Sequence, residues 1–283
     1  MNKYNRLVIL GGGFISTSIK DFLNKKGKYV KIIRKKNIDL TKITQVKNLP
    51  KIIKKTDNVF FAAALAPVKN KKMFEYNIKM ADNIIKIFKK LKFSKFIYLS
   101  SDAVYSDTFQ KITENSKTFP KSLHGQMHLK REKLFRKLTN NNLIIIRPTL
   151  VYGPNDPHNG YGPNKFIRDS KKKLIINLFG KGEEMRDHVY IKDLVRIVEK
   201  IIYSETRGVF NIASGKIISF FQIANVIKNS YRKKISLSFI PRVGPMPHNG
   251  YRAFNIIKIK RNFKNLKIEK ISKIFFKKLI KNY

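Results

Sequence analysis

Two histidines four residues apart are the feature of this chain best suited to proton chemistry. His124 and His128 lie in the segment P-K-S-L-H-G-Q-M-H-L-K-R-E, residues 120–132. Side chains at positions i and i+4 share one face of an α-helix, so a helix here lets both imidazoles act at one point. Imidazole has an ordinary pKa of about 6.5 and serves as general acid, general base or metal ligand. The spacing therefore indicates acid–base chemistry or metal binding.

The surrounding pattern predicts the elements that must position this pair. Apolar runs alternate with helical periodicity, which is typical of βαβ units and a parallel sheet. After Pro154, glycine and proline are scattered and the pattern loosens, which indicates a second, smaller lobe. We expect strands at 6–10, 29–33, 58–64, 95–99 and 143–146, and helices at 14–26, 73–91, from about 125, 189–202, 221–229 and 268–282.

A glycine-rich turn, G-G-G-F-I-S at 11–16, joins the first expected strand to the first helix. Gly11 allows a tight turn, Gly13 lets the backbone approach a pyrophosphate, and Ser16 is small enough for the helix to pack closely on the strand. This context predicts a dinucleotide site. The second strand runs into R-K-K at 34–36, and an arginine there suits a 2′-phosphate, so NADP is favoured over NAD. The alternative is that Arg34 is one more cation in a basic protein.

The predicted fold class is therefore α/β, a Rossmann-like doubly wound parallel sheet with a smaller C-terminal substrate lobe. We expect residues 1–154, with a return segment at about 186–203, to form the NAD(P)-binding domain. Residues 155–185 and 204–283 are expected to form the substrate-binding lobe.

Composition limits the remaining possibilities. With 61 Lys and Arg against 18 Asp and Glu, the 283-residue chain carries a net charge of +43, which attracts nucleic acid, anionic lipid or phosphorylated small molecules. The excess is spread along the chain without an arginine cluster among aromatics, so nucleic-acid binding is not favoured. No apolar segment reaches the roughly 18 residues of a membrane span, so we expect no membrane insertion. The absence of cysteine excludes disulfides and thiol chemistry and agrees with a cytoplasmic protein.

Further motifs, in order and correctly spaced, resemble those of the extended short-chain dehydrogenase/reductases, the NAD-dependent epimerase/dehydratase group that modifies nucleotide sugars. Besides the glycine turn they are D-N-V-F-F-A-A-A at 57–64, Asn77, L-S-S-D-A-V-Y at 99–105, H-G-Q-M-H-L-K-R-E at 124–132, R-P-T-L-V-Y-G-P at 147–154, R-D-H-V-Y-I-K-D at 186–193 and V-F-N-I-A-S-G at 209–215. The resemblance covers nearly the whole chain.

The resemblance implies a catalytic set. The family uses a serine or threonine, a tyrosine that removes a proton from a sugar hydroxyl, and a lysine that holds the nicotinamide ribose and lowers the tyrosine pKa. By position these are Ser101, His124 and His128 here. Asp102 matches the aspartate that dehydratases use as an acid, although Ala103 replaces their next residue, a glutamate.

The resemblance also implies the binding residues. Arg186 matches an arginine that contacts the diphosphate of the nucleotide sugar, and Leu150 stands where many members carry an asparagine. The cofactor would be held by Gly11, Gly13, Phe14, Ile15, Ser16, Arg34, Asp39, Ala62, Ala63, Ala64, Asn77, Ser100, His128 and Pro148, and the substrate by Ser101, Thr149, Leu150 and Arg186. Asp39 could equally cap a turn. Asn164, Lys165 and Arg242 could line the nucleotide site or stand in solvent, and His158, His188 and His248 have no companion.

Three interpretations of the histidine pair follow. The first is an NAD(P)-dependent nucleotide-sugar epimerase, reductase or dehydratase, a homodimer paired through helices 73–91 and 125–138, in which His124 replaces tyrosine as acid–base. The second is a nucleotide-binding protein of the same fold without turnover. The third is a metal site of His124, His128 and Glu132, which share a helical face. Because the resemblance already accounts for Glu132 and no further ligand is obvious, we expect no metal.

Overall fold

The computed structural model describes residues 6–138 and 142–282. The chain divides into two compact units. Unit 1 comprises the chain up to Ser106, Glu114–Pro148 and Val195–Asn211, and unit 2 comprises Asp107–Thr113, Thr149–Leu194 and the chain from Ile212 onward. Residues 186–194, which we assigned to the NAD(P)-binding domain, fall in unit 2 by this division.

Unit 1 is built on a six-stranded sheet. The strand order is β2-β1-β3-β4-β5-β9, and the pairs from β2 to β5 are parallel. The strands are β1 (Leu7–Leu10), β2 (Val30–Ile33), β3 (Asn58–Phe61), β4 (Lys95–Leu99), β5 (Leu143–Pro148) and β9 (Gly208–Ile212). The chain order reverses between β1 and β3, the place where open α/β sheets bind ligands. The predicted Rossmann-like sheet is confirmed.

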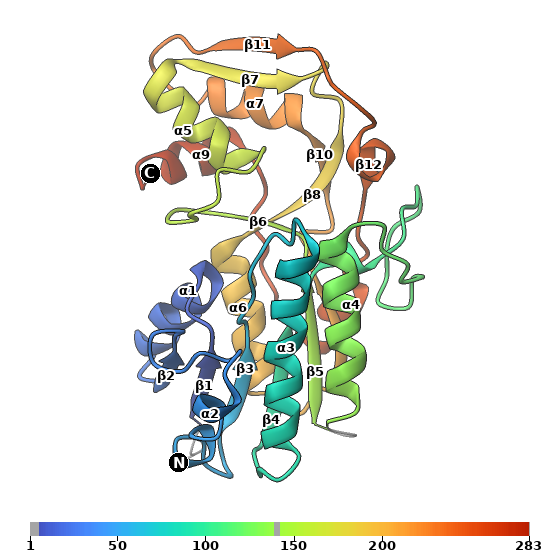
Figure 1. Ribbon diagram of the computed structural model, residues 1–283. Helices are drawn as coiled ribbons and strands as arrows, with labels where there is room; N and C mark the ends of the chain where they lie inside the picture. The colour runs from blue at the N-terminus through green and yellow to red at the C-terminus, as the bar shows by residue number, and fades with distance from the viewer. Residues whose placement is uncertain (1–5, 139–141, 283) are drawn as a thin grey trace. The chain divides into compact units, whose positions relative to one another are not determined.

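Helices cover both faces of this sheet (Figure 1). Helices α3 (Lys71–Phe88) and α4 (Leu123–Arg136) lie side by side on one face, whereas α1 (Phe14–Asn24) and α6 (Ile191–Ile202) lie on the other. A buried aliphatic and aromatic cluster fills the space under α3 and α4, where it joins Phe61, Phe96 and Phe135. Between β2 and β3 the chain forms the short α2 (Ile43–Val46) and η1 (Leu49–Lys51).

Two helices begin later in the structure than the sequence predicts. Residues 189–190 end the strand β8 (Met185–Tyr190), so α6 begins only at Ile191. The C-terminal helix α9 spans Lys273–Ile280 rather than 268–282, because Ser272 accepts a hydrogen bond from the Phe275 backbone and begins the helix there. A helical pattern in the sequence does not by itself set a beginning; a cap or a neighbouring strand does.

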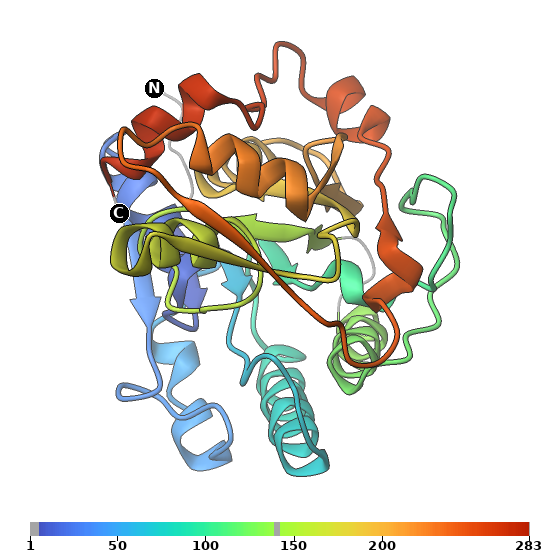
Figure 2. The same ribbon diagram turned by 90° about the horizontal axis from the view of Figure 1, so that it is seen from above.

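Unit 2 contains short strands that the sequence pattern did not reveal. Strand β8 pairs with β6 (Leu150–Tyr152), β10 (Ile217–Ser219) and β12 (Tyr251–Arg252), and β7 (Ile175–Phe179) pairs in parallel with β11 (Ser236–Ile240). Helices α5 (Pro163–Lys173) and α7 (Phe220–Lys228) pack together beside β7 (Figure 2), and α8 (Ile257–Asn262) precedes α9. Strands β6, β10 and β12 have only two or three residues, too few for an alternating pattern to be recognised. Among the described residues, no helix is both long and apolar enough to cross a bilayer.

Candidate functional site

The turn between β1 and α1 has the geometry of a phosphate-binding loop. Gly11 has φ +107°, and a Cβ on it would lie 2.5 Å from the backbone nitrogen of Ala63, so only glycine fits. Gly13 is the N-cap of α1 with φ −79° and no side-chain cap, and nothing lies within 4 Å of a Cβ placed on it. The first backbone N–H groups of an α-helix have no partner within the helix and attract anions. The turn can therefore receive a phosphate group.

This turn forms one wall of a cavity of about 490 Å³ within unit 1. The remaining walls come from Ile33 and the following segment to Lys42, from 62–65 after β3, and from Tyr76 and Met80 of α3. The volume lies within the ordinary range of ligand sites. Of the predicted cofactor residues, Gly11, Gly13, Asp39, Ala62, Ala63 and Ala64 line it.

Two charged residues after β2 take different roles. A Cβ on Gly12 would lie 2.6 Å from Cγ and Nε of Arg34, so the Arg34 side chain lies across the glycine turn. Asp39 accepts hydrogen bonds from the backbone and hydroxyl of Thr41 at 2.9 and 2.7 Å. Burial raises the pKa of Asp39, but these hydrogen bonds and nearby lysines hold it below its ordinary value overall. Asp39 thus caps a turn at the rim of the cavity.

The other predicted cofactor residues do not line this cavity. Phe14, Ile15 and Ser16 form the first turn of α1, where Ser16 is buried. Asn77 of α3 is buried and bonds both backbone groups of Leu65, donating to its carbonyl at 3.0 Å and accepting from its N–H at 3.1 Å. Asn77 therefore shapes the wall after β3. Ser100 and Pro148 are buried at the ends of β4 and β5.

The predicted catalytic residues gather around the start of α4 in unit 1. Ser101 caps the short helix η2 (Asp102–Val104), accepting from the Ala103 backbone at 3.1 Å. Ser122 caps α4 by accepting from the backbone of Gly125 at 3.1 Å. A Cβ on Gly125 would meet the Ala103 carbonyl and lie 2.6 Å from Cβ of Pro120, so glycine allows α4 to pack directly on η2. This contact sets His124 beside Asp102.

The two imidazoles stand edge to face. Their ring centroids are 4.6 Å apart at an interplanar angle of 88°. His124 is half-buried, and its Nδ1 accepts a hydrogen bond of 3.4 Å from the backbone N–H of Val68. Burial lowers the pKa of His124, the Asp102 carboxylate raises it, and Arg131 lowers it further, with a net lowering. His124 is therefore neutral at neutral pH, with its proton on Nε2.

His128 is 5% exposed and is bonded to a residue that the sequence analysis missed. The hydroxyl of Tyr98, on β4, lies 2.7 Å from Nδ1 of His128. Burial raises the pKa of Tyr98, so the phenol keeps its proton and donates it to Nδ1. Burial, His124 and Arg131 all lower the pKa of His128. His128 is thus a neutral imidazole whose Nε2 carries a proton and serves as a hydrogen-bond donor.

Glu132 does not join the histidines in a ligand set. Its carboxylate accepts two hydrogen bonds from Arg147, at 2.8 and 2.5 Å, and one from the Ser100 hydroxyl at 2.6 Å. Arg147 also donates to the Tyr105 hydroxyl, which donates to Asn211. This buried network occupies the carboxylate. Over residues 6–138 and 142–282, no cluster of three His, Cys, Asp or Glu residues could hold a metal ion.

The predicted substrate residues Thr149, Leu150 and Arg186 lie in unit 2. Leu150 is on β6 opposite His188 on β8, and Arg186 donates to Glu184 at 2.9 Å. Arg242 also approaches Glu184, at 3.8 Å, so two guanidinium groups share this one carboxylate, which the sequence analysis missed.

The polar candidates on α5 are engaged within unit 2. Asn164 is 5% exposed, accepts from the Gly153 backbone at 3.0 Å and donates to Asp156. Lys165 forms an ion pair with Asp169 one turn along the helix. Both residues therefore organise the loop and helix that contain them.

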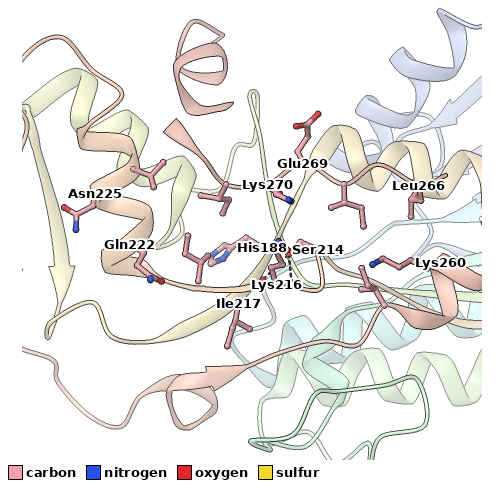
Figure 3. A pocket seen from close by; sticks show the side chains of 15 residues that line it. His188, Ser214, Lys216, Ile217, Gln222, Asn225, Lys260, Leu266, Glu269 and Lys270 are labelled. Atoms are coloured by element: carbon pink, nitrogen blue, oxygen red, sulfur yellow. Dashed lines mark hydrogen bonds between the residues drawn. The ribbon is translucent and has the colours of Figure 1, made fainter. Parts of the chain in front are cut away.

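Unit 2 contains a second cavity, of about 720 Å³. Figure 3 shows that α7 supplies Gln222 and Asn225, while Lys260, Leu266, Glu269 and Lys270 come from the C-terminal segment. Its lining includes His188 and Ser214 but none of the residues predicted for the cofactor, the substrate or catalysis.

Comparison with known proteins identifies the family of this chain. A sequence model of the NAD dependent epimerase/dehydratase family matches residues 7–213. The chain is 23% identical over 217 residues to the uncharacterized UDP-glucose epimerase YtcB of Bacillus subtilis (strain 168), covering 71% of this chain and 67% of that protein.

Solved structures share the fold over nearly the whole chain. A UDP-N-acetylglucosamine 4-epimerase from Methanobrevibacter ruminantium, in complex with UDP-N-acetylmuramic acid, has a TM-score of 0.80 and 22% identity, covering 99% of this chain and 97% of its own. A UDP-glucose 4-epimerase of Thermus thermophilus in complex with NAD has a TM-score of 0.82 and 20% identity, covering 98% of each chain. A GDP-L-fucose synthetase from Naegleria fowleri bound to NADP has a TM-score of 0.82 and 16% identity, covering 99% and 93%.

Proposed function

Because the chain belongs to the NAD dependent epimerase/dehydratase family, we propose that it is an NAD(P)-dependent nucleotide-sugar epimerase, reductase or dehydratase of the extended short-chain dehydrogenase/reductase type. In this proposal His124 and His128 occupy the places of the family's tyrosine and lysine. The observation that supports it most is the edge-to-face histidine pair on α4, in the unit that also holds Asp102 and the glycine-turn cavity. Similar structures contain NAD, NADP or UDP-sugars.

The residues of unit 1 fit a dinucleotide. The glycine turn and the uncapped start of α1 would hold the pyrophosphate, and the cavity beside Asp39 would hold the adenosine. When bound, the nicotinamide would supply the hydride acceptor and donor. Ser101 would donate a hydrogen bond to the reacting oxygen, and Nε2–H of His128 would donate to a ribose hydroxyl.

His124 would move the proton of the sugar hydroxyl. It needs a lone pair on Nε2, whereas Nδ1 now accepts from Val68 and the proton sits on Nε2. A change of tautomer gives up that hydrogen bond of 3.4 Å, at a cost of about 1 kcal/mol. The Asp102 carboxylate favours the protonated imidazole that then forms. The proton transfer is thus accessible to this residue.

One observation favours a second candidate, a nucleotide-binding protein without turnover. Burial and Arg131 both oppose a protonated His124, and the Val68 contact favours the tautomer that cannot accept a proton at Nε2. In that case the pair would serve only as hydrogen-bond donors to a bound nucleotide.

Binding and turnover separate the two candidates. Binding of NADPH, NADH and a panel of UDP- and GDP-sugars is measured by calorimetry, and turnover is followed by nicotinamide absorbance and by NMR of the sugar. For the enzyme, His124→Phe lowers kcat by about 10²- to 10⁴-fold with little change in cofactor affinity. His158→Phe, at an exposed position, is the matched control. Binding without turnover, unchanged by His124→Phe, would support the second candidate and exclude the first.

We also propose a preference for NADP. Arg34 lies across the glycine turn and Lys35 lines the cavity, which places two cations after β2, where the 2′-phosphate would lie. Arg34→Ala is expected to weaken NADPH binding at least tenfold and NADH binding little, whereas Lys36→Ala should change neither. An equal effect of Arg34→Ala on both cofactors would contradict the preference.

The proposed assembly is a homodimer paired through α3 and α4. The exposed face of this helix pair carries Lys72, Lys79, Lys86, Lys130 and Lys133, so two such faces repel one another at low salt. Light scattering after gel filtration at about 0.05 and 0.5 M salt tests this, with a dimer expected at high salt. A monomer at both salt concentrations and at high protein concentration would exclude it.

A further inference from the structure

A buried arginine shares the helical face of the histidine pair. Arg131 follows His128 by three residues and His124 by seven, so the three side chains form one stripe along α4. Its side chain is fully buried. Helical side chains lean toward the N-terminus, which directs Arg131 back toward His128.

The guanidinium is held by backbone carbonyls. Nε and Nη2 donate to the Asn77 carbonyl at 2.9 and 2.5 Å, and Nη1 donates to the Ala63 carbonyl at 2.8 Å. Its Cζ lies 5.2 Å from the centre of the Phe61 ring. The neighbouring carboxylate of Glu132 is paired with Arg147, and in the described part of the chain no carboxylate forms an ion pair with Arg131.

A fixed buried charge without a counter-charge opposes a second positive charge nearby. Seven residues along a helix span about 10 Å. At that separation and an effective dielectric constant of about 20, the repulsion between two unit charges is enough to lower a pKa by about one unit. Removing a guanidinium from water is itself costly, and the hydrogen bonds of Arg131 to the carbonyls of Asn77 and Ala63 offset that cost without neutralising the charge.

We infer that Arg131 is a positioning residue for the histidine pair: it ties α4 to the wall of the glycine-turn cavity at Ala63, and its fixed charge adds to burial in opposing protonation of both imidazoles. The inference rests on the proposed function only in taking this pair as the reacting groups. The family's lysine, at the position of His128, would place a positive charge within the site. In this chain the positive charge of Arg131 lies behind the histidines instead.

The other groups facing the pair do not replace Arg131. Asp102 of η2 is the negative neighbour that acts on His124, and it acts in the opposite direction. Tyr98 of β4 keeps its proton and is uncharged. The charge of Arg147 on β5 is neutralised by Glu132. Helix α3 contributes the Asn77 carbonyl, which already accepts hydrogen bonds from Arg131. The charge state of His124 therefore depends on burial and on the balance between Asp102 and Arg131.

The opposing effects of Asp102 and Arg131 also determine how readily His124 would return a proton to the substrate. A base held neutral into mildly acidic pH is ready to accept a proton at pH 7, and its conjugate acid gives the proton back readily. An Arg131 variant should therefore move the acidic limb of the pH–rate profile upward as well as changing the titration of the free protein.

The test is a histidine titration by NMR on the full-length protein without cofactor, with the imidazole signals assigned from His124→Phe and His128→Phe. In the wild type, both His124 and His128 should titrate below about pH 6.5. Arg131→Met should raise the midpoint of His124 by about one pH unit, whereas Arg131→Lys, which retains the charge, should leave it low. Arg136→Met, on the exposed side of the same helix, is the control and should have no effect.

This titration tests the role of Arg131 whether or not the protein catalyses a reaction. A midpoint that rises in Arg131→Met and stays low in Arg131→Lys supports the inference even for a protein that catalyses nothing. Equal midpoints in the wild type, Arg131→Met and Arg131→Lys would leave Arg131 a purely structural residue and overturn it. If Arg131→Met does not fold, Arg131→Gln replaces it as the uncharged variant with the same two outcomes, and a wild-type midpoint of either histidine at or above about pH 6.5 overturns the inference equally.

Discussion

The hydroxyl of Tyr98 donates a hydrogen bond of 2.7 Å to Nδ1 of His128, and this contact decides which nitrogen of His128 is available to a ligand. It joins β4 to α4 across thirty residues of sequence. Because Nδ1 is an acceptor here, Nε2 holds the proton of the neutral ring. His128 is therefore a hydrogen-bond donor with a fixed direction.

Tyr98→Phe removes this donor and leaves a buried imidazole nitrogen without a partner. We expect the free energy of unfolding to fall by about 1 to 3 kcal/mol, measured by urea denaturation at pH 7. Tyr29→Phe, at a residue that is 65% exposed, should change it by less than about 0.5 kcal/mol. Equal stability of the two variants would show that the Tyr98 contact contributes nothing.

Alanine at Gly11 and at Gly13 should have separable effects. Gly11→Ala forces a Cβ to within 2.5 Å of Ala63 at φ +107°, so both stability and dinucleotide affinity should fall. Gly13→Ala is free of clashes at φ −79°, so stability should be kept while affinity falls at least tenfold, because the methyl group blocks close approach of a pyrophosphate. Thermal unfolding and calorimetric titration with NADPH measure the two quantities. Unchanged affinity in Gly13→Ala would place the phosphates elsewhere.

Glu132→Gln should be among the most destabilising single changes in unit 1. The side chains of Glu132 and Arg147 are 2% and 4% exposed, and neutralising one partner leaves a buried charge. Such a loss costs about 3 to 5 kcal/mol. Glu205→Gln removes a charge that pairs with Arg207 at 3.4 Å and with Lys95 at 4.0 Å, but this glutamate is 91% exposed, so the change should cost at most about 1 kcal/mol. Comparable urea midpoints for the two variants would contradict this difference.

His188→Phe should stabilise unit 2 at acidic pH. Burial lowers the pKa of His188 to about 3, and its Nε2 has no hydrogen-bond partner. Between pH 3 and about 6.5 the unfolded chain binds this proton and the folded chain does not, so the free energy of unfolding falls with falling pH by about 1.4 kcal/mol per pH unit. At pH 5 the free energy of unfolding is therefore about 2 kcal/mol lower than at neutral pH.

The substitution His188→Phe removes this loss of stability at acidic pH and retains the edge-to-face contact with Phe220. The difference in stability between His188→Phe and the wild type should therefore grow from pH 7 to pH 5. Val243→Ala, at a residue that is 98% exposed and does not ionise, should show a constant difference. A pH-independent difference for His188→Phe would mean that the pKa of His188 is the same in the folded and the unfolded chain.

The sequence by itself determined the local features of this protein. The glycine turn, the parallel strands and the shared face of His124 and His128 follow from short-range spacing, because the backbone geometry of a helix or turn repeats every few residues. Tertiary structure decided what stands opposite those residues. It turned Glu132 toward Arg147, bonded His128 to Tyr98, made Asp39 a turn cap, and set Arg131 on the carbonyls of Asn77 and Ala63. The spacing of residues indicates which side chains share one face of a helix. Only the packing of distant segments decides which residues contact that face and how water is excluded from it.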